Sequence, residues 1–242
     1  MILLALEFSS PVRSVAVVSV PEGPGRLQAG APTDNPDLTR PQNGSVLSSV
    51  SDGGAKGIRP LKLVESALLQ AGKKREAIAA IAVGLGPGSY VGIRAAIAIA
   101  QGWELGRGVR VTGIGSGDCI VAGARRRGCL GKVNVAIDAQ RGEIYSAEYE
   151  LDREGFRQLQ PLRLLTIAES QSNFGANVIG PEVNRWFEGG RVIVPEAQEL
   201  GRLAVDRAAW VKAEELEPIY LRATSFVKAP PPRILPEAGG RR

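Results

Sequence analysis

Two acidic residues occupy matching places in two similar stretches of the chain and could bind a metal ion. Glu7 stands in "LLALEFSSPVRSVAVV" and Asp138 in "VNVAIDAQRGEIYSAEY"; each stretch has an apolar strand, the acidic residue, a short polar turn and a second strand. Carboxylate oxygens suit Mg²⁺, so Glu7, Ser9 and Asp138 could be the remnant of a nucleotide or ion site across a cleft. The alternative is that each carboxylate ends its strand and bonds to its own turn. The lack of a phosphate-loop pattern beside either residue favours this alternative.

A glycine-rich turn between an apolar strand and an apolar helix is the second candidate for chemistry. The stretch "GLGPGSYVGIR" matches neither the dinucleotide pattern nor the P-loop pattern, and it is no nucleophile elbow. Proline restricts the backbone, glycine frees it, and a serine follows where it can cap the helix. We therefore predict a structural turn, with anion binding at the helix N-terminus as the alternative. Its residues are Gly86, Pro87, Gly88, Ser89 and Gly92.

The chain contains no histidine, which excludes Ser-His-Asp and Cys-His catalysis and histidine-ligated zinc. Cys119 and Cys129 are the only cysteines, and their spacing fits neither a CxxC motif nor a metal site. They indicate two buried thiols in a reducing cytoplasm. We therefore assign no catalytic residue and no metal ligand from these residue types.

The net charge of +5 permits contact with nucleic acid. Basic residues cluster only in "GKKREA" (72–77), "ARRRG" (124–128) and the last two positions, and aromatic residues make up 5% of the chain. Such composition offers no stacking platform for single strands, so a solvated basic surface is favoured over an RNA-binding module. The first residues lack the features of a signal peptide, and no run approaches eighteen apolar residues, so we expect no membrane attachment.

The hydrophobic pattern predicts alternating strands and helices. Residues 2–8 and 14–20 read as one hairpin and 132–151 as another. Residues 21–57 are rich in Pro, Gly, Asp, Asn and Ser, and we expect partial disorder there with one short strand inside. Helical spacing of apolar residues predicts helices over about 59–71 and 90–106.

The repeated hairpin predicts a duplicated, two-lobed α/β protein. We expect a first lobe over 1–110, a second over 111–217, and a segment at about 218–228 that packs back on the first lobe. A Pro-rich, basic tail over 229–242 is expected to be disordered.

The predicted helix after the glycine turn is apolar nearly all round. From Val91 to Trp103 only Arg94 and Gln101 are polar, and such a helix must be covered on nearly every side. We favour a protein interface over burial entirely within the lobe. The predicted interface residues on the two first-lobe helices are Leu61, Leu68, Tyr90, Ile93, Arg94, Ile97, Ala100 and Gln101.

Four segments together resemble the TsaB (YeaZ) family of bacterial tRNA threonylcarbamoyladenosine biosynthesis proteins. They are "LLALEFSS", "GPGSYVGIR", "VAIDAQRGEIY" and "EPIYLR", in the family's order along most of the chain. The resemblance implies an actin-like, ribonuclease-H-related fold with no catalysis of its own. It implies pairing with a homologous catalytic subunit, TsaD, and recruitment of the ATPase TsaE, to modify an adenosine beside the tRNA anticodon. ATP and Mg²⁺ would belong to the assembled complex, and tRNA would be contacted through it.

The resemblance also implies a helix bundle between the first-lobe helices and the partner, or a second copy of the chain in a homodimer. Three departures limit what can be carried over. Glu7 stands where the family usually has Asp, Val91 where Thr is common, and "RPQNGSVLSSVSDGG" lacks the family's His-Ser pair. Two alternatives stay open: an actin-like phosphotransferase using Glu7 and Asp138 with Mg²⁺, and a basic RNA-binding module.

Overall fold

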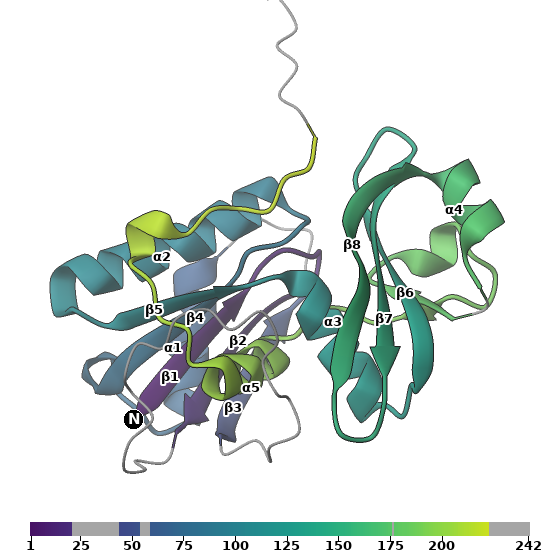
Figure 1. Ribbon diagram of the computed structural model, residues 1–242. Coiled ribbons are helices and arrows are strands. Elements are labelled where there is room, and N and C mark those ends of the chain that lie inside the picture. Colours follow the sequence, from purple (N-terminus) through teal and green to yellow (C-terminus); the bar gives the residue numbers. More distant parts are fainter. Residues whose placement is uncertain (21–43, 54–58, 176, 223–242) are drawn as a thin grey trace, which may run out of the picture.

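The computed structural model describes residues 1–20, 44–53, 59–175 and 177–222, which form two lobes, each built on a five-stranded sheet (Figure 1). In the first sheet the strand order is β3-β2-β1-β4-β5, with β2 antiparallel to both neighbours and β1, β4 and β5 parallel. The strands are β1 (Ile2–Glu7), β2 (Arg13–Ser19), β3 (Ser45–Asp52), β4 (Ile78–Gly84) and β5 (Arg110–Ile114).

The second sheet repeats this arrangement, in the order β8-β7-β6-β9-β10 with the same directions. The predicted duplication and two-lobed α/β fold are therefore confirmed. Glu7 and Asp138 are the last residues of the equivalent strands β1 and β6. The strands are β6 (Gly131–Asp138), β7 (Glu143–Leu151), β8 (Phe156–Thr166), β9 (Val178–Gly180) and β10 (Arg191–Val192).

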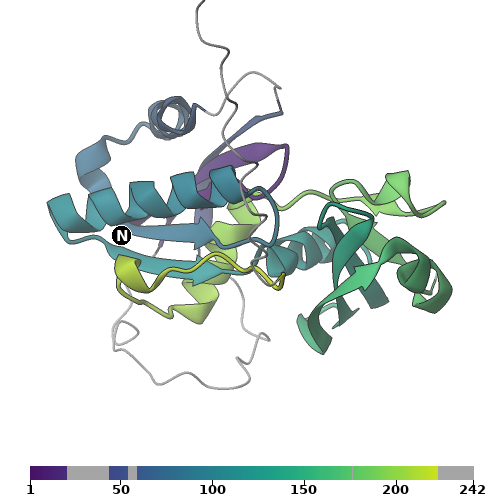
Figure 2. The same ribbon diagram turned by 90° about the horizontal axis from the view of Figure 1, so that it is seen from above.

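Helices cover both faces of the first sheet, as a mainly buried, partly parallel sheet requires. Along β1, Leu4 and Leu6 pack under α1 (Pro60–Gln70) and α2 (Tyr90–Arg107), whereas Leu3 and Ala5 pack toward α5 (Ala197–Arg207). Figure 2 shows α1 and α2 on one side of the sheet and α5 on the other. In the second lobe, α4 (Ile167–Asn173) packs on β8.

Helix α3 (Ser116–Arg126) belongs to the cores of both lobes. Cys119 and Ala122 pack against the first sheet and α5, whereas Ile120 and Val121 pack against the second sheet. Both cysteines are buried free thiols. A helix that is apolar on two opposite sides joins the lobes through packed side chains rather than through a flexible linker.

The division between the lobes differs from the predicted boundary at residue 110. That boundary cuts β5, a strand of the first sheet, and α5 also packs on this sheet although it was expected in the second lobe. Gly201 permits the close approach of α5, since a side-chain carbon there would lie 2.6 Å from Val18. The chain then stays with the first lobe: Val211 bridges to Val111, and the backbone N–H of Ile219 donates to the carbonyl of Leu85 at 2.9 Å.

The expected strand within 21–57 is β3. The predictions for the rest of that segment, for 223–228 and for the tail 229–242 lie outside the described residues. None of the helices in the described part of the chain is both long and apolar enough to cross a membrane.

Candidate functional site

Helix α2 begins after a capping serine and ends at a glycine. The hydroxyl of Ser89 accepts a hydrogen bond from the backbone N–H of Gly92, which caps the first turn. Gly108 ends the helix in the left-handed region at φ 64°. The buried side of the helix consists of Gly92, Ile93, Ala96, Ile97 and Ala100.

Half of the predicted interface residues lie in the first-lobe core and not on the surface. Leu68 of α1, and Ile93, Ile97 and Ala100 of α2, are at most 7% exposed. These four residues lie on the sides of α1 and α2 that pack on the sheet. Their assignment to the interface is therefore wrong. All four are apolar, and composition alone does not show which apolar residues of such a helix face the sheet.

The exposed sides of α1 and α2 carry a different set of apolar residues. Of the predicted interface residues, Leu61 is 55% and Tyr90 is 52% exposed, and Arg94 is also exposed, so all three are accessible to a partner. The sequence analysis missed Leu69, Val91 and Leu105, whose exposed fractions are 82%, 64% and 92%. On α2 the exposed residues recur every three or four positions and so form one stripe. We call Leu61, Leu69, Tyr90, Val91, Arg94, Ala98, Gly102 and Leu105 the α1–α2 face.

One flank of α2 is covered by the C-terminal part of the same chain. The side-chain amide of Gln101 donates to the carbonyl of Ala213 at 3.3 Å, and the backbone N–H of Ala213 donates to Glu104 at 3.0 Å. The apolar character of α2 is therefore explained in part by burial within the lobe. Gln101, predicted as an interface residue, contacts its own chain.

The glycine turn uses its backbone groups within the protein. The N–H of Ser89 donates to the carbonyl of Ser9 at 2.6 Å, and the N–H of Gly86 donates to the hydroxyl of Ser116 at 3.1 Å. With the Gly92 N–H bound to Ser89, three amides that a phosphate loop would offer to an anion are already paired.

Two glycines are required because the turn lies against the end of β1. A side-chain carbon at Gly88 would lie 2.1 Å from the carbonyl oxygen of Ser9, and one at Gly92 would lie 2.0 Å from that of Phe8. Gly88 also has φ 148°, which L side chains rarely adopt. The geometry is that of a turn that fixes where α2 starts.

Glu7 is enclosed beneath this turn and is fully buried. Its carboxyl group accepts hydrogen bonds from the backbone N–H of Ser9 and the hydroxyl of Ser116, both at 2.9 Å. Burial raises the pKa of Glu7, against the opposing effect of these hydrogen bonds. Gly84 provides the room, since a side-chain carbon there would lie 2.0 Å from a carboxyl oxygen of Glu7.

Asp138 lies apart from this carboxyl, in a cleft of about 630 Å³ between the lobes. Its two oxygens accept from the backbone and side chain of Gln140, at 2.7 and 3.1 Å, and Arg185 lies 3.3 Å away. Asp138 therefore bonds to its own turn, as the alternative interpretation held, and a cation already balances its charge. Ser9 and Ser89 also line this cleft, and Glu7 does not.

The predicted remnant of an ion site is thus not assembled. A buried carboxyl with a raised pKa favours its protonated form, which is a poor ligand for a cation. In the described ranges, no three acidic or cysteine side chains are grouped so that they could hold a metal ion.

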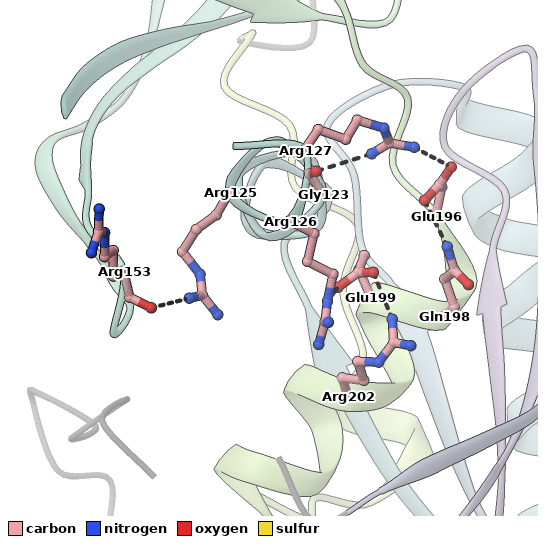
Figure 3. Close-up of polar contacts among 9 residues, drawn as sticks. All are labelled: Gly123, Arg125, Arg126, Arg127, Arg153, Glu196, Gln198, Glu199 and Arg202. Carbon is pink, nitrogen blue, oxygen red and sulfur yellow. Dashed lines mark hydrogen bonds and ion pairs between the residues drawn. The ribbon is translucent and has the colours of Figure 1, made fainter. Parts of the chain in front are cut away.

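The basic run 124–128 is largely used inside the molecule. Arg126 and Arg202 both contact the carboxylate of Glu199, at 2.8 and 2.7 Å, and Arg127 contacts Glu196 at 2.8 Å (Figure 3). Arg125 points away from this cluster and donates to the carbonyl of Arg153. These pairs connect α3 with α5 and the residue before it, so the run is a connection between elements and not a free basic patch.

Comparisons with known proteins agree with this fold. A family model for TsaD, tRNA N6-adenosine threonylcarbamoyltransferase, matches residues 58–199, more than half of the chain. The chain is 32% identical to the tRNA threonylcarbamoyladenosine biosynthesis protein TsaB of Escherichia coli (strain K12) over 183 residues, 68% of this chain and 79% of the relative. It is 26% identical to the protein of the same name from Haemophilus influenzae, over 68% of this chain and 78% of that relative.

Two solved structures from Pseudomonas aeruginosa have the same fold. One is YeaZ, with a TM-score of 0.69 and 26% identity, and the match covers 91% of this chain and 99% of that chain. The other is described as an uncharacterized protein with similarity to peptidase YeaZ, with a TM-score of 0.68, 25% identity and the same coverage.

Proposed function

The chain belongs to the TsaB (YeaZ) family, and from that premise we propose that it is a non-catalytic subunit of the complex that makes N6-threonylcarbamoyladenosine in tRNA. In this proposal it docks through the α1–α2 face onto a homologous catalytic subunit, TsaD, and the assembled pair recruits the ATPase TsaE. ATP and Mg²⁺ act in the complex, tRNA is contacted through it, and the complex works in the cytoplasm.

The observation that carries the proposal is the exposed apolar stripe on α2. Val91 and Leu105 are 64% and 92% exposed although the helix has a separate side packed on the sheet. A contiguous apolar surface in water is characteristic of an interaction site. Ala98 and Gly102 lie between Arg94 and Leu105 and are small enough for another helix to approach closely.

The character of the partner follows from the shape of this surface. Two helices lying on one sheet face each present a ridge of side chains, which suits packing against helices of another protein. A homologous subunit would bring the same two helices, because it would share the fold. A second copy of this chain is the other candidate and would give a homodimer.

A supporting role, without catalysis, is consistent with the chemistry of the chain. The absence of histidine rules out the nucleophile-histidine pair of serine and cysteine peptidases. Glu7 is enclosed and Asp138 is paired with Arg185, so neither carboxylate is placed to hold Mg²⁺ for phosphoryl transfer. The paired arginines of α3 give no support to an RNA-binding module.

The test is a charge placed on the α1–α2 face. Val91→Asp should weaken binding to the TsaD subunit of the same organism at least about tenfold, because the interface would have to bury an unpaired carboxylate. Leu130→Asp is the matched control, since Leu130 is an exposed apolar residue of the second lobe. Titration calorimetry measures affinity, and circular dichroism checks that both variants are folded.

The same samples test the function. Unmodified tRNA should become modified only when this chain, TsaD and TsaE are present together, and Val91→Asp should reduce the yield. Normal binding by a folded Val91→Asp variant would reject the interface. Modification that proceeds equally well without this chain would reject the role in the complex.

A further inference from the structure

The segment Leu216–Arg222, "LEPIYLR", crosses from the first lobe to the second, and we call it the strap. It follows the 3-10 turn Ala213–Glu215 (η3), which lies beside α2, and runs on toward the second lobe (Figure 1). The hydrogen bond of Ile219 holds it on the first lobe, but neither the fold of that lobe nor the proposed interface accounts for its contact with the second lobe.

The strap is anchored firmly in the first lobe. Leu216 is buried in the core beneath α2, and the backbone N–H of Ile219 donates to the carbonyl of Leu85, just before the glycine turn. Gly113 leaves room for this path, since a side-chain carbon there would lie 2.5 Å from Leu85 and 3.0 Å from Leu216.

The middle of the strap contacts the α1–α2 face. The ring centres of Tyr220 and Tyr90 lie 5.4 Å apart. The guanidinium of Arg94 lies over the ring of Tyr90, 4.6 Å from its centre. Burial and the neighbouring Tyr90 raise the pKa of Tyr220 to about 12. A partner that contacts Tyr90 or Arg94 would therefore act on Tyr220 as well.

The end of the strap holds the β6–β7 turn of the second lobe. Arg222 forms an ion pair with Glu143 and donates to the carbonyl of Gln140 at 3.3 Å. The same carbonyl accepts the backbone N–H of Glu143 at 3.2 Å, so Arg222 binds the turn where it closes. This turn carries Asp138 and Gln140 into the cleft between the lobes.

We propose that the strap couples the α1–α2 face to the β6–β7 turn, so that a partner seated on Tyr90 and Arg94 alters the mobility of that turn. Only two residues separate Ile219 from Arg222, so the Cα atoms of Ile219 and Arg222 lie about 10 Å apart at most when the segment is extended. So short a link has little slack to absorb a displacement of Tyr220. The part played by the partner rests on the proposed function, whereas the coupling itself belongs to this chain.

Amide hydrogen exchange on the isolated full chain tests the coupling. The readout is the exchange of the backbone N–H groups of Ala139 and Glu143, which bond within the turn, and of Ile167, which bonds to the carbonyl of Gly142. Arg222→Gln should raise their exchange rates by about threefold, because the turn loses a partly buried ion pair. Tyr90→Ala should raise the same rates although it lies in the other lobe.

Two controls decide between the strap and other routes. Leu69→Ala alters the α1–α2 face at a distance from the strap and should leave the turn unchanged, and the double variant Tyr90→Ala/Arg222→Gln should exchange no faster than Arg222→Gln alone. The proposal fails if Tyr90→Ala alters only first-lobe amides, if Arg222→Gln leaves the turn at wild-type rates, or if the two changes add.

The partner is examined in a second measurement. Adding TsaD should slow exchange at the turn in the wild type but not in Arg222→Gln, although both bind. If the wild type does not bind TsaD, the proposed function fails. The exchange measurements on the isolated chain would still test whether the strap couples the α1–α2 face to the β6–β7 turn. If TsaD binds and slows the turn equally in both proteins, the strap is not the route.

Discussion

At the scale of single residues, Glu7 illustrates how position changes the chemistry of a side chain. A carboxyl at the end of the first strand of an actin-like lobe could serve a cation, yet here it lies under the glycine turn with Ser9 and Ser116 as partners. It connects the end of β1 to the start of α3, and Ser116 extends the connection to Gly86. Its role in this chain is structural.

The burial of Glu7 predicts a dependence of stability on pH. In the unfolded chain the Glu7 carboxyl ionises as the pH rises past its ordinary pKa of 4.5. In the folded protein its pKa is raised, so the carboxyl stays protonated to higher pH. The contribution of Glu7 to stability is therefore fully present below pH 4.5 and is lost as pH rises through the folded pKa. Glu7→Gln cannot ionise, so its unfolding free energy relative to the wild type should increase over that range. The gain is about 1.4 kcal/mol for each unit by which the pKa is raised.

Urea unfolding followed by tryptophan fluorescence from about pH 4 to pH 8 measures this difference. Glu65→Gln is the control, because the Glu65 side chain is 57% exposed. Parallel pH profiles for the wild type and Glu7→Gln would contradict the prediction.

At the scale of elements, α2 has three sides with different surroundings. One side packs on the sheet through Ile93 and Ile97, a flank is covered by η3 through Gln101, and the stripe through Val91 and Leu105 is exposed. Substitutions on α2 should therefore separate into those that affect stability and those that affect docking.

Ile97 and Val91 show this separation directly. Ile97→Ala removes a buried side chain and should reduce the free energy of unfolding by about 2–4 kcal/mol. The affinity of the molecules that remain folded for TsaD should stay within about twofold of wild type. Val91→Ala should change stability by less than about 0.5 kcal/mol, since Val91 is mostly exposed. Urea unfolding and calorimetric titration measure the two quantities, and equal stability losses in the two variants would contradict this division of the helix.

At the scale of the whole molecule, the lobes are joined on two sides. Helix α3 joins the two cores and is tied to α5 by the pairs around Glu199, while the strap joins α2 to the β6–β7 turn. Asp118 adds to the first connection, because it accepts from Tyr149 of the second lobe and from Arg207 of α5.

Removing the charge of Glu199 should weaken this connection. Glu199 is 1% exposed between Arg126 and Arg202, so Glu199→Gln leaves two guanidinium groups without their carboxylate. We expect the free energy of unfolding to fall by about 2 kcal/mol and the thermal unfolding midpoint by about 4–8 °C. The loss is smaller than for a fully buried pair because the Arg126 side chain is 39% exposed.

Differential scanning calorimetry measures the change. Glu150→Gln, which breaks the exposed pair with Arg157, is the matched control and should cost less than about 0.5 kcal/mol. Similar midpoints for the two variants would show that the connection between α3 and α5 does not depend on this charge.

Much of the fold could be predicted from the sequence, because its signals are local. Alternating apolar residues predicted both hairpins, and Ser89 and Gly108 lie at the ends of α2, where a capping hydroxyl and a left-handed glycine are favourable. The duplication followed from comparing the stretches around Glu7 and Asp138, since equivalent strands need the same pattern of buried residues.

Tertiary structure alone decided which residues are available to a partner and how the lobes are joined. On α2, Ile97 and Val91 are both apolar, and only the position of the sheet makes one of them core and the other surface. Glu7 and Ser116, and Arg222 and Glu143, are far apart in the chain, and local pattern does not specify such pairs. By itself the sequence determined the elements and the family, because local periodicity and motifs encode them. The exposed stripe, the buried carboxyl and the strap depend on long-range packing.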